Sequence, residues 1–204
     1  MGCNASKGVS ETTQRTMCGT HLNSPDDLVH WPQFPEGTNS ALSRHLSKKI
    51  WDKYKDKTDS AGVSFKTCIF SGCKNLDSGI GVYAGSMDSY NCFNEFFDKI
   101  IEEYHGHGPS AKHVSDMDAS GLNCPPFSEE EAAMVKSTRI RVGRNLAEFP
   151  LGPGISDDQR NSIMDTVVAA CNEFDGDLAG KFYALDKMTP EEQQGLIDNH
   201  FLFK

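Results

Sequence analysis

One stretch of this chain decides its fold class: Ser137-Thr138-Arg139-Ile140-Arg141-Val142-Gly143-Arg144-Asn145. Residues two apart in a β-strand point to the same side, so Arg139 and Arg141 would lie together on one face. Two adjacent guanidinium groups disfavour each other unless an anion lies between them, and their planar donors suit phosphate oxygens. The stretch therefore predicts a phosphate-binding strand. A solvated edge strand with scattered charge is the alternative.

Two further stretches accompany this one. The first is Asn75-Leu76-Asp77-Ser78-Gly79-Ile80-Gly81-Val82-Tyr83-Ala84, and the second is Gln193-Gln194-Gly195-Leu196-Ile197-Asp198-Asn199-His200-Phe201-Leu202-Phe203-Lys204. Together with the arginine stretch they resemble, in order, three motifs of the phosphagen (ATP:guanidino) kinases, and arginine kinases most of all. The resemblance covers roughly residues 40–204.

The resemblance implies an α+β fold of two domains. A small all-α N-terminal domain is expected over residues 38–108, followed by a linker over 109–133. The first part of an α/β catalytic domain with an antiparallel sheet is expected over 134–204. Because the family continues beyond the point that matches Lys204, we expect the chain to be a fragment of a longer enzyme, truncated within its catalytic domain.

The resemblance also assigns ligand-binding residues. Nucleotide binding, of ATP or ADP with Mg²⁺, would fall to Ser137, Thr138, Arg139, Ile140, Arg141 and His200. Binding of the guanidino substrate would fall to Ser78, Gly79, Ile80, Gly81, Val82 and Tyr83. The family's catalytic glutamates and reactive cysteine have no counterpart here, so no residue of this chain is expected to be catalytic.

The glycine-containing loop can be interpreted without the resemblance. Glycines let backbone N–H groups approach a ligand closely, and such a run can bind a carboxylate. Tyr83 can donate or accept one hydrogen bond near a guanidinium. An ordinary turn beside a core tyrosine is the alternative. The short loop and Tyr83 resemble the arginine-specific type, which favours L-arginine as the substrate.

The N-terminal residues Met1-Gly2-Cys3-Asn4-Ala5-Ser6-Lys7 match the pattern for N-myristoylation at Gly2, and Cys3 is a candidate for palmitoylation. Two acyl chains hold a protein stably to a membrane, whereas one does so only marginally. Residues 8–37 are rich in Ser, Thr, Asn, Pro and Gly and show no hydrophobic period, so residues 1–37 are expected to form a flexible, acylated tail. This predicts a protein on the cytoplasmic face of a membrane.

Composition argues against several other classes. The formal charge of −9 argues against non-specific binding of nucleic acid. Seven scattered cysteines, without a secretory signal peptide, indicate free thiols in a reducing cytosol. The histidines at 105, 107 and 113 have no acidic or cysteine partner at ligand spacing, so no metal site is expected.

Hydrophobic periodicity and capping residues predict the elements. The expected helices span 40–57, 89–104, 157–174 and 189–199, the expected strand spans 135–142, and the run 63–71 fits either type.

These observations favour an arginine kinase, which forms phosphoarginine from ATP and buffers the ATP supply, held at a membrane by acylation. The isolated chain is expected to be nearly inactive. Another guanidino kinase, acting on taurocyamine, lombricine or creatine, is one alternative. A non-catalytic, membrane-anchored binding module is the other.

Overall fold

The computed structural model describes residues 14–138 and 140–202. The acylation candidates Gly2 and Cys3, and the nucleotide-binding candidate Arg139, lie outside the described residues. The chain divides into two compact units, Met1–Ile155 and Ser156–Lys204. Among the described residues, no helix is both long and apolar enough to cross a bilayer.

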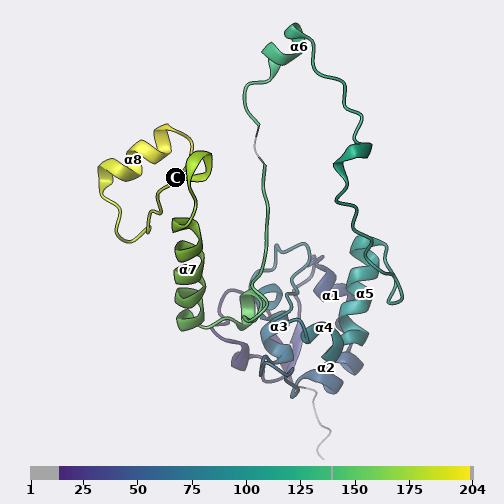
Figure 1. The fold of residues 1–204 in the computed structure, drawn as a ribbon. Coiled ribbons are helices and arrows are strands. Elements are labelled where there is room, and N and C mark those ends of the chain that lie inside the picture. Colours follow the sequence, from purple (N-terminus) through teal and green to yellow (C-terminus); the bar gives the residue numbers. More distant parts are fainter. Residues whose placement is uncertain (1–13, 139, 203–204) are drawn as a thin grey trace, which may run out of the picture. The chain divides into compact units, whose positions relative to one another are not determined.

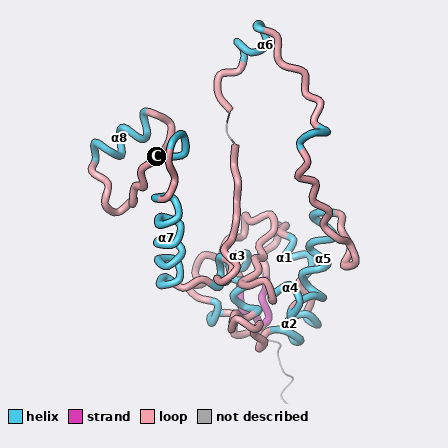
Figure 2. Tube along the Cα trace, in the orientation of Figure 1, coloured by secondary structure: helices cyan, strands magenta, loops and turns pink. Residues whose placement is uncertain are grey.

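The segment before the first helix is folded onto the rest of the unit. Strand β1 (Arg15–Met17) pairs in parallel with β2 (Trp31–Gln33), and the short 3-10 helix η1 (Pro25–Asp27) lies between them in the chain (Figure 2). Cys18, Leu22 and Leu28 are buried in the core. The expectation of a flexible tail as far as residue 37 is thus wrong for residues 14–37, because these apolar side chains are removed from water there.

The helix predicted over residues 40–57 is two helices, α1 (Ala41–His45) and α2 (Lys48–Tyr54). Ser40 caps the first by accepting a hydrogen bond from the Ser43 N–H at 3.1 Å. Ser47 caps the second by accepting from the Ile50 N–H at 3.3 Å. A second N-cap serine inside an amphipathic stretch lets the chain stop and restart a helix while keeping its apolar face inward.

The run after Gly62 is helical, forming α3 (Phe65–Lys74). The strong helix predicted over 89–104 is confirmed, but it is interrupted at Phe93 into α4 (Ser89–Cys92) and α5 (Asn94–His105). Gly106, with φ of 71°, ends α5 in the left-handed conformation that glycine adopts without steric cost.

An aromatic cluster joins these helices. The ring centroids of Tyr54 and Phe65 are 5.5 Å apart, and those of Phe65 and Phe93 are 5.3 Å apart. Phe96 of α5 completes the cluster at 5.3 Å from Phe65. The Phe65–Phe93 and Phe65–Phe96 pairs meet edge-on, and the Tyr54–Phe65 pair is tilted. Such contacts stabilise beyond the burial of area alone, so α2, α3 and α5 form one core.

The described residues 109–138 and 140–146 contain little regular structure: the 3-10 helix η2 (Ala119–Gly121) and helix α6 (Glu129–Met134) (Figure 1). The strand predicted over Val135–Val142 is not formed in its described residues, 135–138 and 140–142. Ile140 is 84% exposed. A strand requires a neighbour for its backbone hydrogen bonds, and this stretch has none among the described residues. Residues 145–154, here called the returning segment, bring the chain back to the helices of the first unit and contain the 3-10 helix η3 (Gly152–Gly154).

The second unit contains helix α7 (Asp157–Asn172), the 3-10 helix η4 (Gly176–Leu178) and helix α8 (Pro190–Asp198). Capping boxes begin both longer helices, at Ser156 and Thr189. These two predicted helices are confirmed, because their start signals are local and need no tertiary partner.

Candidate functional site

The glycine-containing loop is held between two helices. Its carbonyl groups at Gly79 and Ile80 accept hydrogen bonds, each 2.9 Å long, from the N–H groups of Ala41 and Leu42. These donors belong to the first turn of α1, where N–H groups have no partner within the helix. At the other end of the loop, the Tyr83 N–H donates to the carbonyl of Cys68 in α3 at 2.9 Å. The loop is therefore fixed at both ends.

Close backbone packing explains two of the glycines. A Cβ atom on Gly72 of α3 would lie 2.3 Å from the carbonyl oxygen of Gly81. Gly81 itself has φ of 75°, which disfavours any other residue. Helix α3 and the loop thus cross at two glycines, and this crossing sets the height of the loop above the helix.

The loop also offers uncommitted donors. Ser78 and Tyr83 donate their N–H groups to backbone carbonyls, at 3.2 and 2.9 Å. Four consecutive N–H groups between them donate to no protein acceptor in the described part of the chain: those of Gly79, Ile80, Gly81 and Val82. Such a run has the donor capacity that an anion-binding loop requires.

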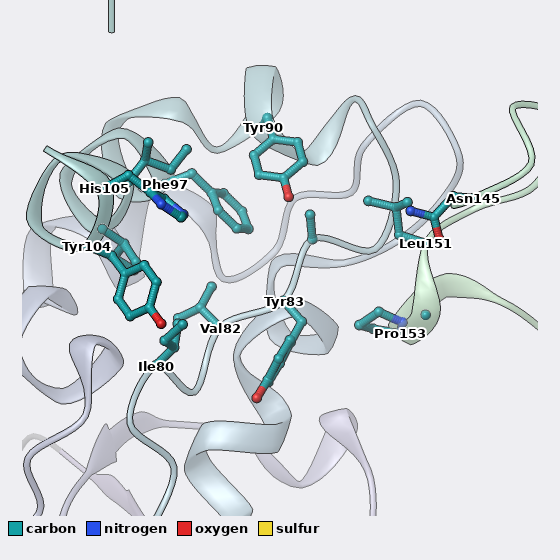
Figure 3. Close-up of a pocket in the computed structure, with 14 residues that line it drawn as sticks. Ile80, Val82, Tyr83, Tyr90, Phe97, Tyr104, His105, Asn145, Leu151 and Pro153 are labelled. Atoms are coloured by element: carbon teal, nitrogen blue, oxygen red, sulfur yellow. The ribbon is translucent and has the colours of Figure 1, made fainter. Parts of the chain in front are cut away.

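A cavity of about 400 Å³ lies beside the loop (Figure 3). The rings of Tyr83, Tyr90 and Tyr104 lie around the same space, which the loop, α4, α5 and the returning segment enclose. Tyr83 is 46% exposed, so its ring is not a core side chain. The lining includes Ile80, Val82, Tyr83, Phe97, Tyr104 and Leu151.

Of the six substrate-binding candidates, the structure places Ile80, Val82 and Tyr83 on the cavity wall. Ser78, Gly79 and Gly81 belong to the same loop but do not line the cavity. The assignment of these residues to a substrate stays a prediction. The geometry shows that an apolar, aromatic pocket adjoins the loop.

Sequence reasoning missed part of this wall. Helical spacing places Tyr104 on the inner face of its helix, yet it is 63% exposed at the end of α5. Leu151 and Pro153 come from the returning segment, more than sixty residues after the loop. Phe149 and Pro150 extend the resemblance of the arginine stretch to the kinase motif, but they give no information about where this segment lies.

The chemistry of the cavity suits a planar cation such as a guanidinium group better than a small, strongly hydrated cation. None of its lining residues carries a carboxylate. Aromatic faces attract guanidinium groups electrostatically, most strongly where water is excluded. The three tyrosine hydroxyl groups can each donate or accept one hydrogen bond.

The described nucleotide-binding candidates in the first unit are exposed. Ser137, Thr138, Ile140 and Arg141 lie in irregular chain. The Arg141 guanidinium forms no ion pair with any described residue, so its charge is available to an anion such as a phosphate. His200 belongs to the second unit and follows α8 with φ of 62°. Within residues 14–138 and 140–202, no three His, Cys, Asp or Glu side chains cluster closely enough to hold a metal ion.

Comparison with known proteins identifies the class. Residues 36–102 match the model of the ATP:guanido phosphotransferase N-terminal domain. The chain is 42% identical over 166 residues to an arginine kinase of Anthopleura japonica, and 40% identical over 166 residues to the arginine kinase Lit v 2.0101 of Penaeus vannamei. Each alignment covers 81% of this chain.

Solved structures of guanidino kinases are also similar to this chain. A crystal structure of lombricine kinase superposes with a TM-score of 0.69 at 30% identity, covering 81% of this chain and 45% of that one. The substrate-free duplicated taurocyamine kinase of Schistosoma mansoni gives 0.70 at 26% identity, covering 83% of this chain and 24% of that one.

The chain therefore belongs to the ATP:guanido phosphotransferase family, also called the phosphagen kinases. The predicted class, an all-α N-terminal domain followed by the beginning of an α/β domain, is confirmed by these neighbours. The chain spans 46% of the length of the Penaeus vannamei enzyme and 23% of the Anthopleura japonica enzyme.

Proposed function

We propose that this chain is the substrate-recognising part of an arginine kinase, which transfers the γ-phosphoryl group of ATP to L-arginine and releases ADP and phosphoarginine. One observation carries the proposal: the loop of residues 78–83 combines four uncommitted N–H groups with a tyrosine on the wall of an aromatic cavity. The identity of 40–42% with arginine kinases supports the same substrate.

In this proposal the substrate binds in an extended orientation. Its carboxylate accepts hydrogen bonds from N–H groups of Gly79, Ile80, Gly81 or Val82. Its guanidinium lies among the tyrosine rings, where Tyr83 supplies a hydrogen-bonding hydroxyl. The contribution of this part of the protein is to orient the nucleophilic nitrogen, because positioning, together with neutralisation of phosphate charge, is the main source of rate in phosphoryl transfer.

For the nucleotide we propose Arg139 and Arg141 as the phosphate clamp, with Ser137, Thr138 and Ile140 beside them and His200 in the nucleotide pocket. The residues fit an anion, because Arg141 has no carboxylate partner in the described chain. Mg²⁺ bound with the nucleotide would neutralise phosphate charge. Since no carboxylate lines the cavity, we expect little or no turnover from these 204 residues alone.

Titration of L-arginine into the purified chain, by calorimetry, tests the substrate assignment. The variant Tyr83→Ala should weaken binding on the order of tenfold, since it removes a ring and a hydrogen bond. Tyr183→Ala, a tyrosine of the second unit, is the matched control. Equal affinities for all three proteins would refute the proposed site. Competition with taurocyamine, lombricine and creatine would show which guanidino compound is preferred.

We also propose that Gly2 is myristoylated and Cys3 palmitoylated, which would hold the enzyme at the cytoplasmic face of a membrane. There the enzyme would regenerate ATP beside a local consumer. The sequence pattern at residues 1–7 is the support. Fractionation of cells that express the wild type and Gly2→Ala tests the idea. The same distribution of both proteins between membrane and cytosol would rule it out.

A non-catalytic binding module is the second candidate, favoured by a cavity whose lining contains no carboxylate. An assay of the native protein, isolated from its source, distinguishes the kinase from the binding module. Formation of phosphoarginine from ATP and L-arginine supports the kinase. Binding of L-arginine without formation of phosphoarginine supports the module.

A further inference from the structure

The turn between α2 and α3 contains a buried carboxylate. The Asp59 residue is 6% exposed. Its Oδ1 atom accepts hydrogen bonds from the N–H groups of Ala61 at 3.0 Å and Val63 at 2.9 Å. Gly62, with φ of 78°, completes the turn. One oxygen of the carboxylate therefore shapes its own turn.

The other oxygen reaches the far end of the glycine-containing loop. Asp59 Oδ2 accepts hydrogen bonds from the hydroxyl groups of Ser86 at 2.7 Å and Ser89 at 2.6 Å. The Ser89 oxygen in turn accepts from the N–H groups of Gly85 and Ser86, each at 3.1 Å. Asp59 is thus connected through Ser89 to the backbone at Gly85.

Gly85 lies at a junction between the two sides of the cavity. It follows Tyr83 by two residues, and its carbonyl accepts the Leu151 N–H at 2.9 Å. A Cβ atom on Gly85 would lie 2.2 Å from Val63 Cγ1, and one on Gly154 would lie 2.3 Å from the Gly85 oxygen. The Gly85 backbone is therefore enclosed, and any shift of it would move both the loop and the returning segment.

The charge of Asp59 strengthens this connection. Burial opposes ionisation, but the hydrogen bonds from Ser89, Ser86 and the turn outweigh it and hold the pKa of the carboxyl below its usual range. Hydrogen bonds to an ionised acceptor are about twice as strong as neutral ones. The network is fully paired, since no buried side-chain polar atom in the described chain lacks a partner. Loss of Asp59 would leave both serine hydroxyl groups without their acceptor, and loss of the Ser89 hydroxyl would leave the Gly85 N–H without one.

We propose that Asp59 is a positioning residue for the substrate loop: through Ser89 it fixes the backbone at Gly85, and so determines where Tyr83 and Leu151 stand around the cavity. The proposal rests on the proposed function in one respect, that the cavity receives the guanidino substrate. Asp59 itself does not line the cavity, so it acts only through the residues that it holds.

Two variants break the connection at different points. Asp59→Asn removes the charged acceptor, and Ser89→Ala removes the bridge to Gly85. Ser86→Ala is the matched control, because it deletes a hydroxyl group that donates to the same carboxylate oxygen and accepts from the Asp88 N–H, but leaves the Ser89 bridge to Gly85 intact. The first readout is amide hydrogen exchange of Tyr83 and Leu151, neither of which donates its N–H to Asp59 or Ser89.

We expect exchange at both amides to rise on the order of tenfold in Asp59→Asn and in Ser89→Ala, and to rise no further in the double variant. Ser86→Ala should stay close to wild type. The second readout is the Kd of the full chain for L-arginine, which should weaken on the order of tenfold in the same variants. If Asp59→Asn does not fold, the comparison of Ser89→Ala with Ser86→Ala alone tests the positioning role.

Wild-type exchange at Tyr83 and Leu151 in folded Ser89→Ala would overturn the positioning role. The role is equally overturned if Ser86→Ala changes exchange and affinity as much as Ser89→Ala does, because the bridge would then have no special part. If the wild-type chain binds no L-arginine, the proposed function fails, while the exchange data still decide the role of Asp59.

Discussion

The backbone N–H of Leu151 donates a 2.9 Å hydrogen bond to the carbonyl oxygen of Gly85. This bond joins the chain that follows the long segment 109–146 to the end of the glycine-containing loop. The loop and the returning segment both line the same aromatic cavity. Residues far apart in sequence therefore share one site because of a contact between two backbones.

Gly85→Ala should destabilise the first unit by about 2 kcal/mol, because the new methyl group would overlap Val63 Cγ1 at 2.2 Å. Urea unfolding followed by circular dichroism measures the free energy of unfolding. Gly152→Ala is the control, since its Cβ would meet no atom within 4 Å. Coincident unfolding curves for the two variants would contradict the packing described for Gly85.

Gly72→Ala should displace the loop from α3, because the added Cβ would lie 2.3 Å from the Gly81 oxygen and 2.7 Å from Leu42 Cδ2. We expect weaker L-arginine binding together with a lower midpoint of thermal unfolding. In Gly121→Ala, whose Cβ would face open space, both quantities should match the wild type. Retained affinity in Gly72→Ala would mean that the loop's height above the helix does not matter for binding.

Leu28→Ala should cost about 2–5 kcal/mol, as expected for a fully buried leucine, because the N-terminal segment is part of the core. Val29→Ala, at a neighbouring side chain that is 62% exposed, should change stability by less than about 0.5 kcal/mol. Chemical denaturation of both variants provides the comparison. Similar, small effects would show that residues 14–37 do not unfold with the helices.

Acid should weaken the fold partly through Asp59. Its pKa is lower in the folded state than in the unfolded state, so its contribution to stability is full above the unfolded value near 3.8 and declines as pH falls through the folded value. The free energy of unfolding of Asp59→Asn should therefore depend less on pH below about pH 4. Parallel pH profiles for variant and wild type would show that Asp59 titrates alike in both states.

Thiol reactivity should follow burial. Burial raises the pKa of Cys68, and the neighbouring Cys18 thiol together with burial raises the pKa of Cys73. Cys124 and Cys171 are exposed. Because the thiolate is the reactive form, iodoacetamide should alkylate this exposed pair before Cys68 and Cys73 in the native protein. Peptide mass spectrometry after timed quenching reports the order, and early labelling of Cys68 would contradict the structure.

Local signals explain the parts of the fold that the sequence predicted correctly. The capping boxes at Ser156 and Thr189 begin helices within a residue of the expected start, because each is complete within four residues. The apolar spacing from Phe93 to Ile100 likewise predicted a buried helix face. The glycines of residues 79–81 indicated a loop that approaches something closely, and the motif order identified the family.

The predictions that failed concern features that depend on contacts with other parts of the chain. A strand over 135–142 needs a partner strand, and the described residues supply none, so alternation alone was misleading. Residues 14–37 are rich in polar and turn-forming side chains, yet Cys18, Leu22 and Leu28 enter the core. The break between α1 and α2 was hidden because Ser47 interrupts the backbone without interrupting the apolar face.

The sequence alone thus determined the family, most of the helices and the loop that offers its N–H groups, since these depend on short-range spacing and on residue type. The tertiary structure alone decided that Tyr83, Tyr104 and Leu151 share a cavity and that Asp59 is connected to it through Ser89. The physical reason is distance along the chain. A hydrogen bond between residues 30 positions apart leaves no periodic trace in a sequence, whereas a cap or an amphipathic face does.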